Sequence, residues 1–208
     1  METQILWVMD TRKQQSNTKR RSIFVTSFSF FVISFIGWLY ETTLMYISTG
    51  EYCDRGFLRL PFCPIYGGVV CLLYLLCGTP KEGAFAGWVE KLCLRKGWHL
   101  GIARMLRYVG YFLLAMLLAT GAELVVGLLF QRAGCCLWSY GGMVCNYKGV
   151  ISLPVSLFWG FLITVAMRYP FSWLLVWVEK IPKPILVGAS IVLAVATSMD
   201  FVVCLVRL

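Results

Sequence analysis

The sequence IFVTSFSFFVISFIGWLY, from Ile23 to Tyr40, runs for 18 residues without a charged side chain. The hydrocarbon core of a bilayer, about 30 Å thick, is spanned by a helix of about 20 apolar residues. The rest of the chain has the same character, since 59% of its 208 residues are hydrophobic and 14% are charged. A soluble domain of this length could not bury so much apolar surface. We therefore expect an all-α polytopic membrane protein.

Further long stretches also have few or no charges, and one of them, residues 60–80, begins with Pro61 and Pro64. Proline is tolerated in the first turn of a helix and in membrane helices generally. Together the stretches predict about five transmembrane helices, at residues 23–47, 60–78, 109–130, 150–167 and 185–206. Residues 23–208 would then form a single transmembrane domain, preceded by a cytoplasmic polar tail at residues 1–22.

Lysine and arginine are unevenly distributed between these spans. Fourteen lie in the N-terminal tail and in the second and fourth loops, whereas five lie in the other loops and at the C-terminal end. Basic segments stay in the cytoplasm, so we expect a multi-pass protein of the cell membrane with its N-terminus inside and its C-terminus outside. The net charge of +9 then fits attraction to the anionic lipid bilayer, and no nucleic acid is needed as a partner.

Two sequence patterns occur twice, at nearly the same distance. Residues 55–62 read RGFLRLPF and residues 148–155 read KGVISLPV, 93 positions apart, while Trp-Val-Glu-Lys begins at Trp88 and again at Trp177, 89 positions apart. Their common order favours a parallel tandem repeat of two spans and one cytoplasmic amphipathic segment, followed by a fifth span. Chance similarity of the short patterns is the alternative.

Three carboxylates fall inside predicted spans, namely Glu41, Glu123 and Asp200. Each lies 14 to 18 residues beyond the start of a span that runs from inside to outside, so all three should lie in the outer third of the bilayer. Acids at such positions normally face the bundle interior or a watery cavity. We consider three roles, which are structural pairing with nearby cations, a path for a substrate or for protons, and snorkelling to the interface. The candidate intramembrane path therefore consists of Glu41, Glu123, Asp200, Arg55, Arg59 and Lys148.

Other chemistry is sparsely represented. The sequence GTPKEG at residues 78–83 resembles a phosphate-binding loop, but Ala84 and Phe85 follow where Lys and Ser or Thr are required. A single histidine, His99, supports neither a Ser-His-Asp triad nor a zinc site. We expect no enzymatic activity, no cofactor and no metal. Five cysteines near the outer face are either small apolar residues or partners in one disulfide, namely Cys53, Cys63, Cys135, Cys136 and Cys145.

Three strings in the first half, GWLYE at 37–41, RGFL at 55–58 and PFCPIYG at 61–67, resemble the membrane family named Putative ABC-transporter type IV, or CmpB-like. The stretch from Trp138 to Pro154 is similar to the second signature of that family, and the resemblance covers roughly residues 35–168. It departs from the family at Ser139, where aspartate is usual, and at Val150, where a polar residue is common. The motif residues in this chain are Gly37, Trp38, Tyr40, Gly56, Pro61, Pro64, Tyr66, Gly67, Trp138, Tyr140, Asn146 and Gly149.

The resemblance implies a permease-like component of an ABC-type transporter that lacks its own ATPase domain. Loop 79–107 is long and basic and contains an amphipathic stretch, so it is the expected docking surface for a separate ATPase subunit. Five short helices enclose little volume, which favours a homodimer. The alternative is a non-transporting membrane protein, an assembly or sensory partner in which the intramembrane carboxylates are structural.

Overall fold

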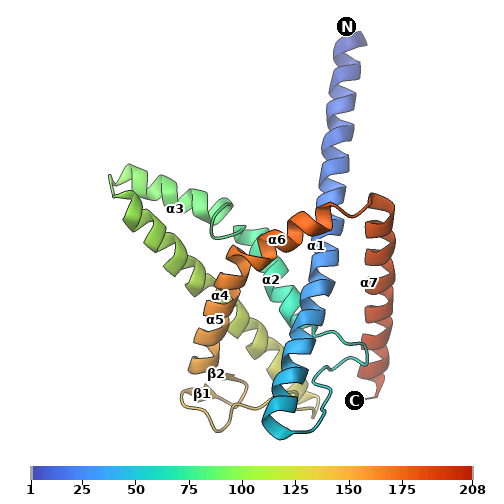
Figure 1. Cartoon of the computed structure of the whole chain (residues 1–208), viewed down its shortest axis with the longest axis vertical. Coiled ribbons are helices and arrows are strands. Elements are labelled where there is room, and N and C mark those ends of the chain that lie inside the picture. The colour runs from blue at the N-terminus through green and yellow to red at the C-terminus, as the bar shows by residue number, and fades with distance from the viewer. Residues whose placement is uncertain (1, 208) are drawn as a thin grey trace.

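The computed structural model describes the backbone of residues 2–207, and the side chains of residues 23–207 apart from that of Leu100. Its elements are α1 (Glu2–Thr49), α2 (Pro64–Cys77), α3 (Ala84–Arg95), α4 (Leu100–Arg132), β1 (Asn146–Tyr147), β2 (Ile151–Ser152), α5 (Leu153–Arg168), α6 (Pro170–Glu179) and α7 (Lys183–Val206). Helices α1, α4 and α7 run from the N-terminal end of the molecule to the opposite end, and α2 and α5 run back (Figure 1). Helix α1 begins at Glu2. The backbone of residues 2–22, which were expected to form a polar tail, is therefore helical and continuous with the first span.

Three helices are long and apolar enough to cross a bilayer, namely Ile23–Thr49 within α1, Gly101–Arg132 within α4, and α7. Helices α5 and α6 pass the same test only together, with a bend of 44° between them, which corresponds to a broken span or a re-entrant loop. The bend falls at Tyr169, since Pro170 has no amide hydrogen and disfavours helical geometry in the residue before it. A helical membrane protein is therefore confirmed, but the described residues give three spans, or up to four, rather than the expected five.

Helix α2 differs most from its prediction. A span was expected at residues 60–78, but the helix begins at Pro64 and has 14 residues, a length of about 21 Å, which is too short to cross a bilayer alone. The chain before it is irregular, and the amide of Cys63 donates a hydrogen bond of 2.9 Å to the carbonyl of Ser34 in α1. Proline is favoured at the first position of a helix, so α2 starts at Pro64, about halfway along the apolar part of α1.

Glycines allow close contact within two pairs of helices, α1 with α2 and α4 with α5. A Cβ atom at Gly67 would lie 2.4 Å from the Oγ of Ser34, and one at Gly160 would lie 2.8 Å from the Cβ of Met116. The two glycines are 93 positions apart, the same separation as the repeated pattern that precedes each of them, and their two contact residues are 82 positions apart. The order of one long helix and two shorter helices thus occurs twice, in α1–α3 and in α4–α6, before α7.

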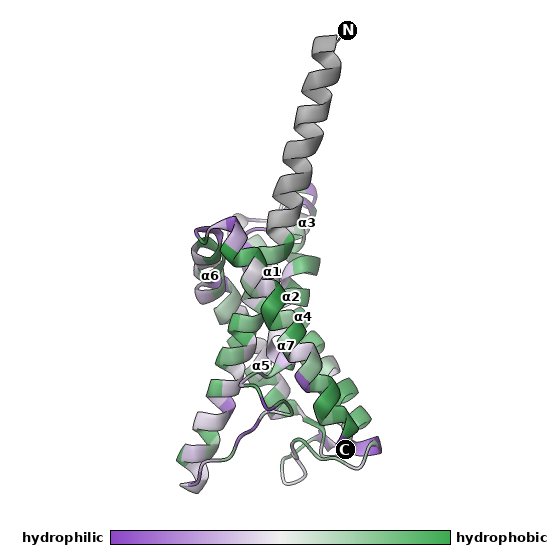
Figure 2. Cartoon of the chain, turned by 90° about the vertical axis from the view of Figure 1, so that its right-hand side faces the viewer, coloured by the Kyte–Doolittle hydropathy of each residue, from purple (hydrophilic) through white to green (hydrophobic). Residues whose placement is uncertain are grey.

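The main core lies where α2, α4, α5 and α6 meet. Its buried residues are Val69, Val70, Leu73, Tyr111, Ala115, Ala119, Ile163, Met167 and Phe171. Helix α7 packs mainly on α1, through a smaller cluster of Val25 of α1, Val178 of α6 and Leu186 of α7. Only 6% of the most apolar stretch of α7 is buried. Figure 2 shows mainly hydrophobic residues along the helices and hydrophilic ones in connecting segments. Many large hydrophobic side chains of the helices are exposed, as expected where lipid is the solvent.

The glycine contacts predict a difference between two adjacent positions. Gly67→Ala should lower the free energy of unfolding by about 1–3 kcal/mol, because the added methyl group overpacks the contact between α1 and α2. Gly68→Ala is the matched control, since a Cβ atom there meets nothing within 4 Å. Circular dichroism melting in detergent measures both, and equal melting temperatures for the two variants would contradict the close contact.

Candidate functional site

The first carboxylate of the site, Glu41 of α1, has two partners. The hydroxyl of Tyr66 in α2 donates a hydrogen bond to its Oε1, and the Nε of Arg55 lies 3.8 Å from its Oε2. Tyr66 fits against α1 only because Gly37 has no side chain, since a Cβ atom there would lie 2.4 Å from the tyrosine ring. Glu41 and Arg55 are about 30% and 27% exposed, so this pair keeps partial contact with the surroundings.

The second carboxylate, Glu123 of α4, is buried and only 8% exposed. Its Oε1 accepts hydrogen bonds from the hydroxyl of Tyr140 at 3.1 Å and from the indole nitrogen of Trp159 at 3.0 Å. Its Oε2 is buried without a hydrogen-bond partner among the described residues. Buried polar groups are normally satisfied, so this oxygen is exceptional.

Aromatic rings join the two carboxylates into one site. The ring of Trp159, which donates to Glu123, lies 5.2 Å from the ring of Tyr66, which donates to Glu41. Tyr40 packs on the other edge of the site, with its ring 6.0 Å from that of Trp159. Trp159 was not among the candidate residues, and its spacing of 93 positions from the motif residue Tyr66 was the signal that could have identified it.

Tyr140 reaches the site from the loop between α4 and β1. Burial, together with the neighbouring Glu123 carboxyl, raises the pKa of Tyr140 above its ordinary value. The phenol therefore keeps its proton at physiological pH and serves as a hydrogen-bond donor to Glu123.

Three other residues of the second signature shape the loop that carries Tyr140. The indole of Trp138 donates to the carbonyl of Val150 at 2.8 Å, and the amide of Gly149 donates to the Asn146 side chain at 3.2 Å. Gly149 has a φ of +70°, which glycine adopts without strain, and its carbonyl accepts from the amide of Tyr140 at 2.7 Å. These residues position the loop and do not touch either carboxylate.

Asp54, which was not a candidate, organises the loop that carries Arg55. Its Oδ1 accepts hydrogen bonds from the indole of Trp38 at 2.8 Å and from the amide of Gly56 at 3.1 Å. The loop is thereby tied to α1 about one helical turn from Glu41, which directs Arg55 toward that carboxylate. The motif residues Trp38 and Gly56 therefore act through the loop and not by direct contact with the carboxylates.

Asp200 does not join the pair formed by Glu41 and Glu123. Its Oδ2 accepts hydrogen bonds from the backbone amides of Arg59 and Leu60 at 2.8 and 2.9 Å, so it attaches the loop between α1 and α2 to α7. The side chain of Arg59 is exposed, and so is Lys148, whose Nζ lies 5.5 Å from the ring centroid of Tyr147. Of the six candidate path residues, the structure brings together Glu41, Glu123 and Arg55.

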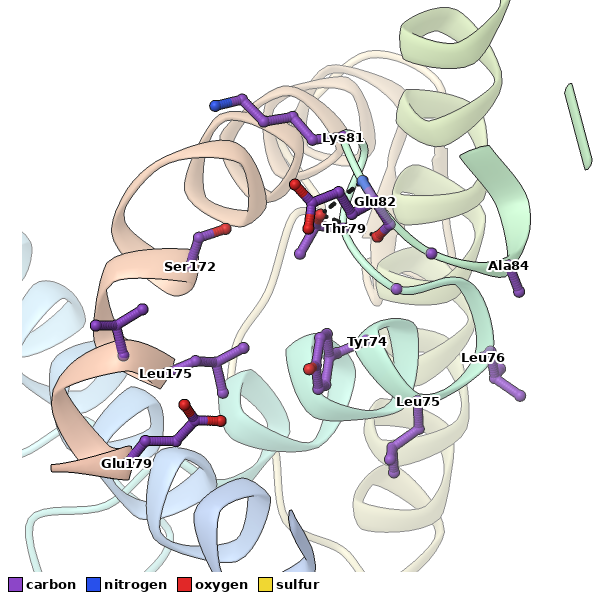
Figure 3. A pocket seen from close by; sticks show the side chains of 13 residues that line it. Tyr74, Leu75, Leu76, Thr79, Lys81, Glu82, Ala84, Ser172, Leu175 and Glu179 are labelled. Carbon is purple, nitrogen blue, oxygen red and sulfur yellow. Dashed lines mark hydrogen bonds between the residues drawn. The ribbon is translucent and has the colours of Figure 1, made fainter. Parts of the chain in front are cut away.

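A cleft of about 700 Å³ lies at the N-terminal end of the molecule, between the end of α2, the 78–83 loop and α6. Figure 3 shows Tyr74 and Ser172 pointing into it from opposite sides, while Lys81 extends away. The loop is closed by Thr79, whose hydroxyl lies 3.1 Å from both the carbonyl and the amide of Glu82. The cleft lies at the opposite end of the helices from Glu41 and Glu123.

All nine cysteines of the chain are free thiols, including the five for which one disulfide was an alternative.

Residues 28–205 match the model of a protein family described as Putative ABC-transporter type IV. The match includes both carboxylates, their aromatic partners and the cleft, and it extends to the C-terminal part of α7. No curated protein and no solved structure matches the chain.

The hydrogen bond to the buried carboxyl predicts a defined loss of stability. Trp159→Phe keeps an aromatic ring but removes the donor to Glu123, which should lower the free energy of unfolding by about 1–3 kcal/mol. The control is Trp173→Phe, because Trp173 in α6 is 63% exposed and exposed substitutions usually change stability by less than about 0.5 kcal/mol. If circular dichroism melting gives the same result for both variants, the hydrogen bond has no stabilising role.

Proposed function

The chain belongs to the family described as Putative ABC-transporter type IV, and on this basis we propose that it is a permease-like component of a transporter whose ATPase is a separate chain. The observation that carries the proposal is the pair of carboxylates, Glu41 and Glu123, brought together among membrane helices. Carboxylates are costly inside a membrane, and those that occur there commonly line a path for a substrate or an ion. A separate ATPase is proposed because the GTPKEG loop at residues 78–83 lacks the Lys-Ser/Thr pair that a nucleotide site requires.

The proposed arrangement has five membrane-embedded segments, α1, α2, α4, α5 and α7, in the cell membrane. Basic residues, among them Lys91, Arg104 and Lys183, lie at the end of the molecule that contains the start of α1. They support an orientation in which this end faces the cytoplasm. The carboxylate pair then lies toward the outer face. The recurring helix order and the 93-residue spacing of Gly67 and Gly160 support two tandem units followed by α7.

The proposed docking surface for the ATPase is α3 with the start of α4, within the loop 79–107 of the sequence. Helix α3 lies at the N-terminal end, away from α1 and α7 (Figure 1). One of its faces is buried through Val89 and Cys93, which pack with Ala103 of α4. Its basic side chains, including Lys91 and Arg95, are exposed, so they are accessible to an acidic surface of a partner subunit.

The orientation makes a prediction about chemical labelling. In intact cells, a membrane-impermeant maleimide should modify Cys136 and Cys145, which are exposed and would lie outside. A cysteine introduced by Lys96→Cys should react only after the cells are permeabilised, because residue 96 would face the cytoplasm. Mass spectrometry of the peptides identifies the labelled sites, and labelling at residue 96 in intact cells would reverse the proposed orientation.

The ATPase prediction concerns the partner and its surface. After chemical crosslinking in native membrane, the wild-type chain should co-purify with a subunit that contains a Walker A motif and hydrolyses ATP. The double variant Lys91→Glu/Arg95→Glu should lose this subunit because it reverses the charge of α3. The variant Arg132→Glu, which changes an exposed residue at the other end of α4, should retain it.

A role for the carboxylates gives a second measurement on the same complex. Glu41→Gln should leave the ATPase bound, because the substituted residue lies far from the docking surface. It should change ATP hydrolysis in liposomes several-fold, because Glu41 belongs to the proposed transport path. A chain that co-purifies with no ATPase would be a non-transporting assembly or sensory partner instead. An ATPase whose binding does not depend on the charge of α3 would contradict the proposed docking surface.

A further inference from the structure

Glu41 and Glu123 occupy corresponding places in the two helix pairs. They are 82 positions apart, as are Ser34 and Met116, the residues that contact Gly67 and Gly160. Their hydrogen-bond donors, Tyr66 and Trp159, are 93 positions apart, like the two glycines. In each pair an acid on the long helix accepts a hydrogen bond from an aromatic residue on the short helix.

The two acids differ in their cations. Arg55 lies 3.8 Å from Glu41, and the residue 93 positions after Arg55 is Lys148. Lys148 has a left-handed backbone with φ of 53°, and its side chain is exposed beside Tyr147. It makes no ion pair with Glu123, and the described residues contain no other cation paired with that carboxyl.

The groups that face Glu123 come from every element packed around it. Tyr140 and Trp159 donate hydrogen bonds to its Oε1, Tyr66 packs on Trp159, and beyond Tyr66 lies Glu41 with its partner Arg55. Within the described part of the chain, the site therefore contains two carboxyl groups and one cation, and that cation is already paired. A second full negative charge there would be buried without compensation, which is costly in a low-dielectric interior.

The unpartnered oxygen provides independent evidence about Glu123. Its Oε2 is buried and has no hydrogen-bond partner among the side chains that the structure describes, although the residue as a whole is 8% exposed. An ionised carboxylate spreads its charge over both oxygens and requires donors for both, whereas a protonated carboxyl needs far less solvation. Two hydrogen bonds on Oε1 and none on Oε2 fit a proton on Oε2.

From these observations we propose that Glu123 is a proton-binding residue, neutral in this structure, while Glu41 is ionised and paired with Arg55. Proton release from Glu123 then requires a cation or water to approach it. The inference deepens the proposed transport function, since it identifies a proton as an ion carried at the same site. The protonation state itself is measured without any transport.

Infrared spectroscopy of the full chain in lipid tests the proposal directly. At neutral pH, the carbonyl stretch of a protonated carboxylic acid should be present in the wild type and absent in Glu123→Gln. It should persist in Glu41→Gln, the matched control at the corresponding position. Loss of an ionised carboxylate band in Glu123→Gln, with no change in the acid band, would overturn the proposal.

Labelling of the wild-type protein gives a measurement that does not depend on the folding of a variant. Dicyclohexylcarbodiimide reacts with protonated carboxyl groups in apolar surroundings: the acid proton moves to a carbodiimide nitrogen, the carboxyl oxygen adds to the central carbon, and the acyl group then shifts to nitrogen. Nothing is released, so the peptide gains the whole mass of the reagent.

Mass spectrometry should find this adduct on Glu123 and at most a tenth as much on Glu41. Equal labelling of both residues, or no labelling of Glu123, would contradict a proton on Glu123. These results are independent of the ATPase, because a chain that binds no ATPase can still carry the proton, and an ionised Glu123 leaves the ATPase proposal intact.

Discussion

The hydrogen bond from the indole of Trp159 to Glu123 requires the surrounding helices to lie close together. A buried acid among membrane helices has no water to solvate it, so the protein must supply the donors. Trp159 reaches Glu123 from α5 because Gly160 lets α5 approach α4 closely. The same ring packs on Tyr66, which connects α5 to α2 and, through Glu41, to α1. Four helices are therefore positioned by the need to satisfy two carboxyl groups.

Helix α4 connects the two ends of the molecule. Near its start, Ala103 packs under α3, the surface that we propose for the ATPase, and nearer its end it carries Glu123. Between them, the fully buried Tyr111 donates a hydrogen bond to the carbonyl of Gly78 at 2.8 Å, which attaches α4 to the loop beside the cleft. Helix α4 therefore extends from the proposed docking surface to the carboxylate pair.

Much of the membrane character could be predicted, because hydropathy and the absence of charge report directly on lipid contact. The helices at Ile23–Thr49, Gly101–Arg132 and Lys183–Val206 all contain a predicted span. The length of α2 could not be predicted in the same way, since residues 60–63 are apolar but irregular, and their backbone is held by a contact with Ser34. The candidate acids were identified by their cost in a membrane, and Arg55, Tyr66 and Tyr140 were among the candidate or motif residues. Which acid each of them contacts, and the role of Trp159, could not be predicted, because pairing depends on which helices touch.

The sequence by itself determined the class of protein, the family, and three candidate acids, Glu41, Glu123 and Asp200. These properties follow from local chemistry, namely uncharged stretches, short motifs and repeated residues. Tertiary structure alone decided that Glu41 is paired with Arg55 while Glu123 has no cation among the described side chains of residues 23–207, that Asp200 caps a backbone segment, and that Trp159 lies between the two carboxylates. The reason is that burial and hydrogen bonding arise between helices far apart in the chain, and small differences in their contact determine which charges are compensated.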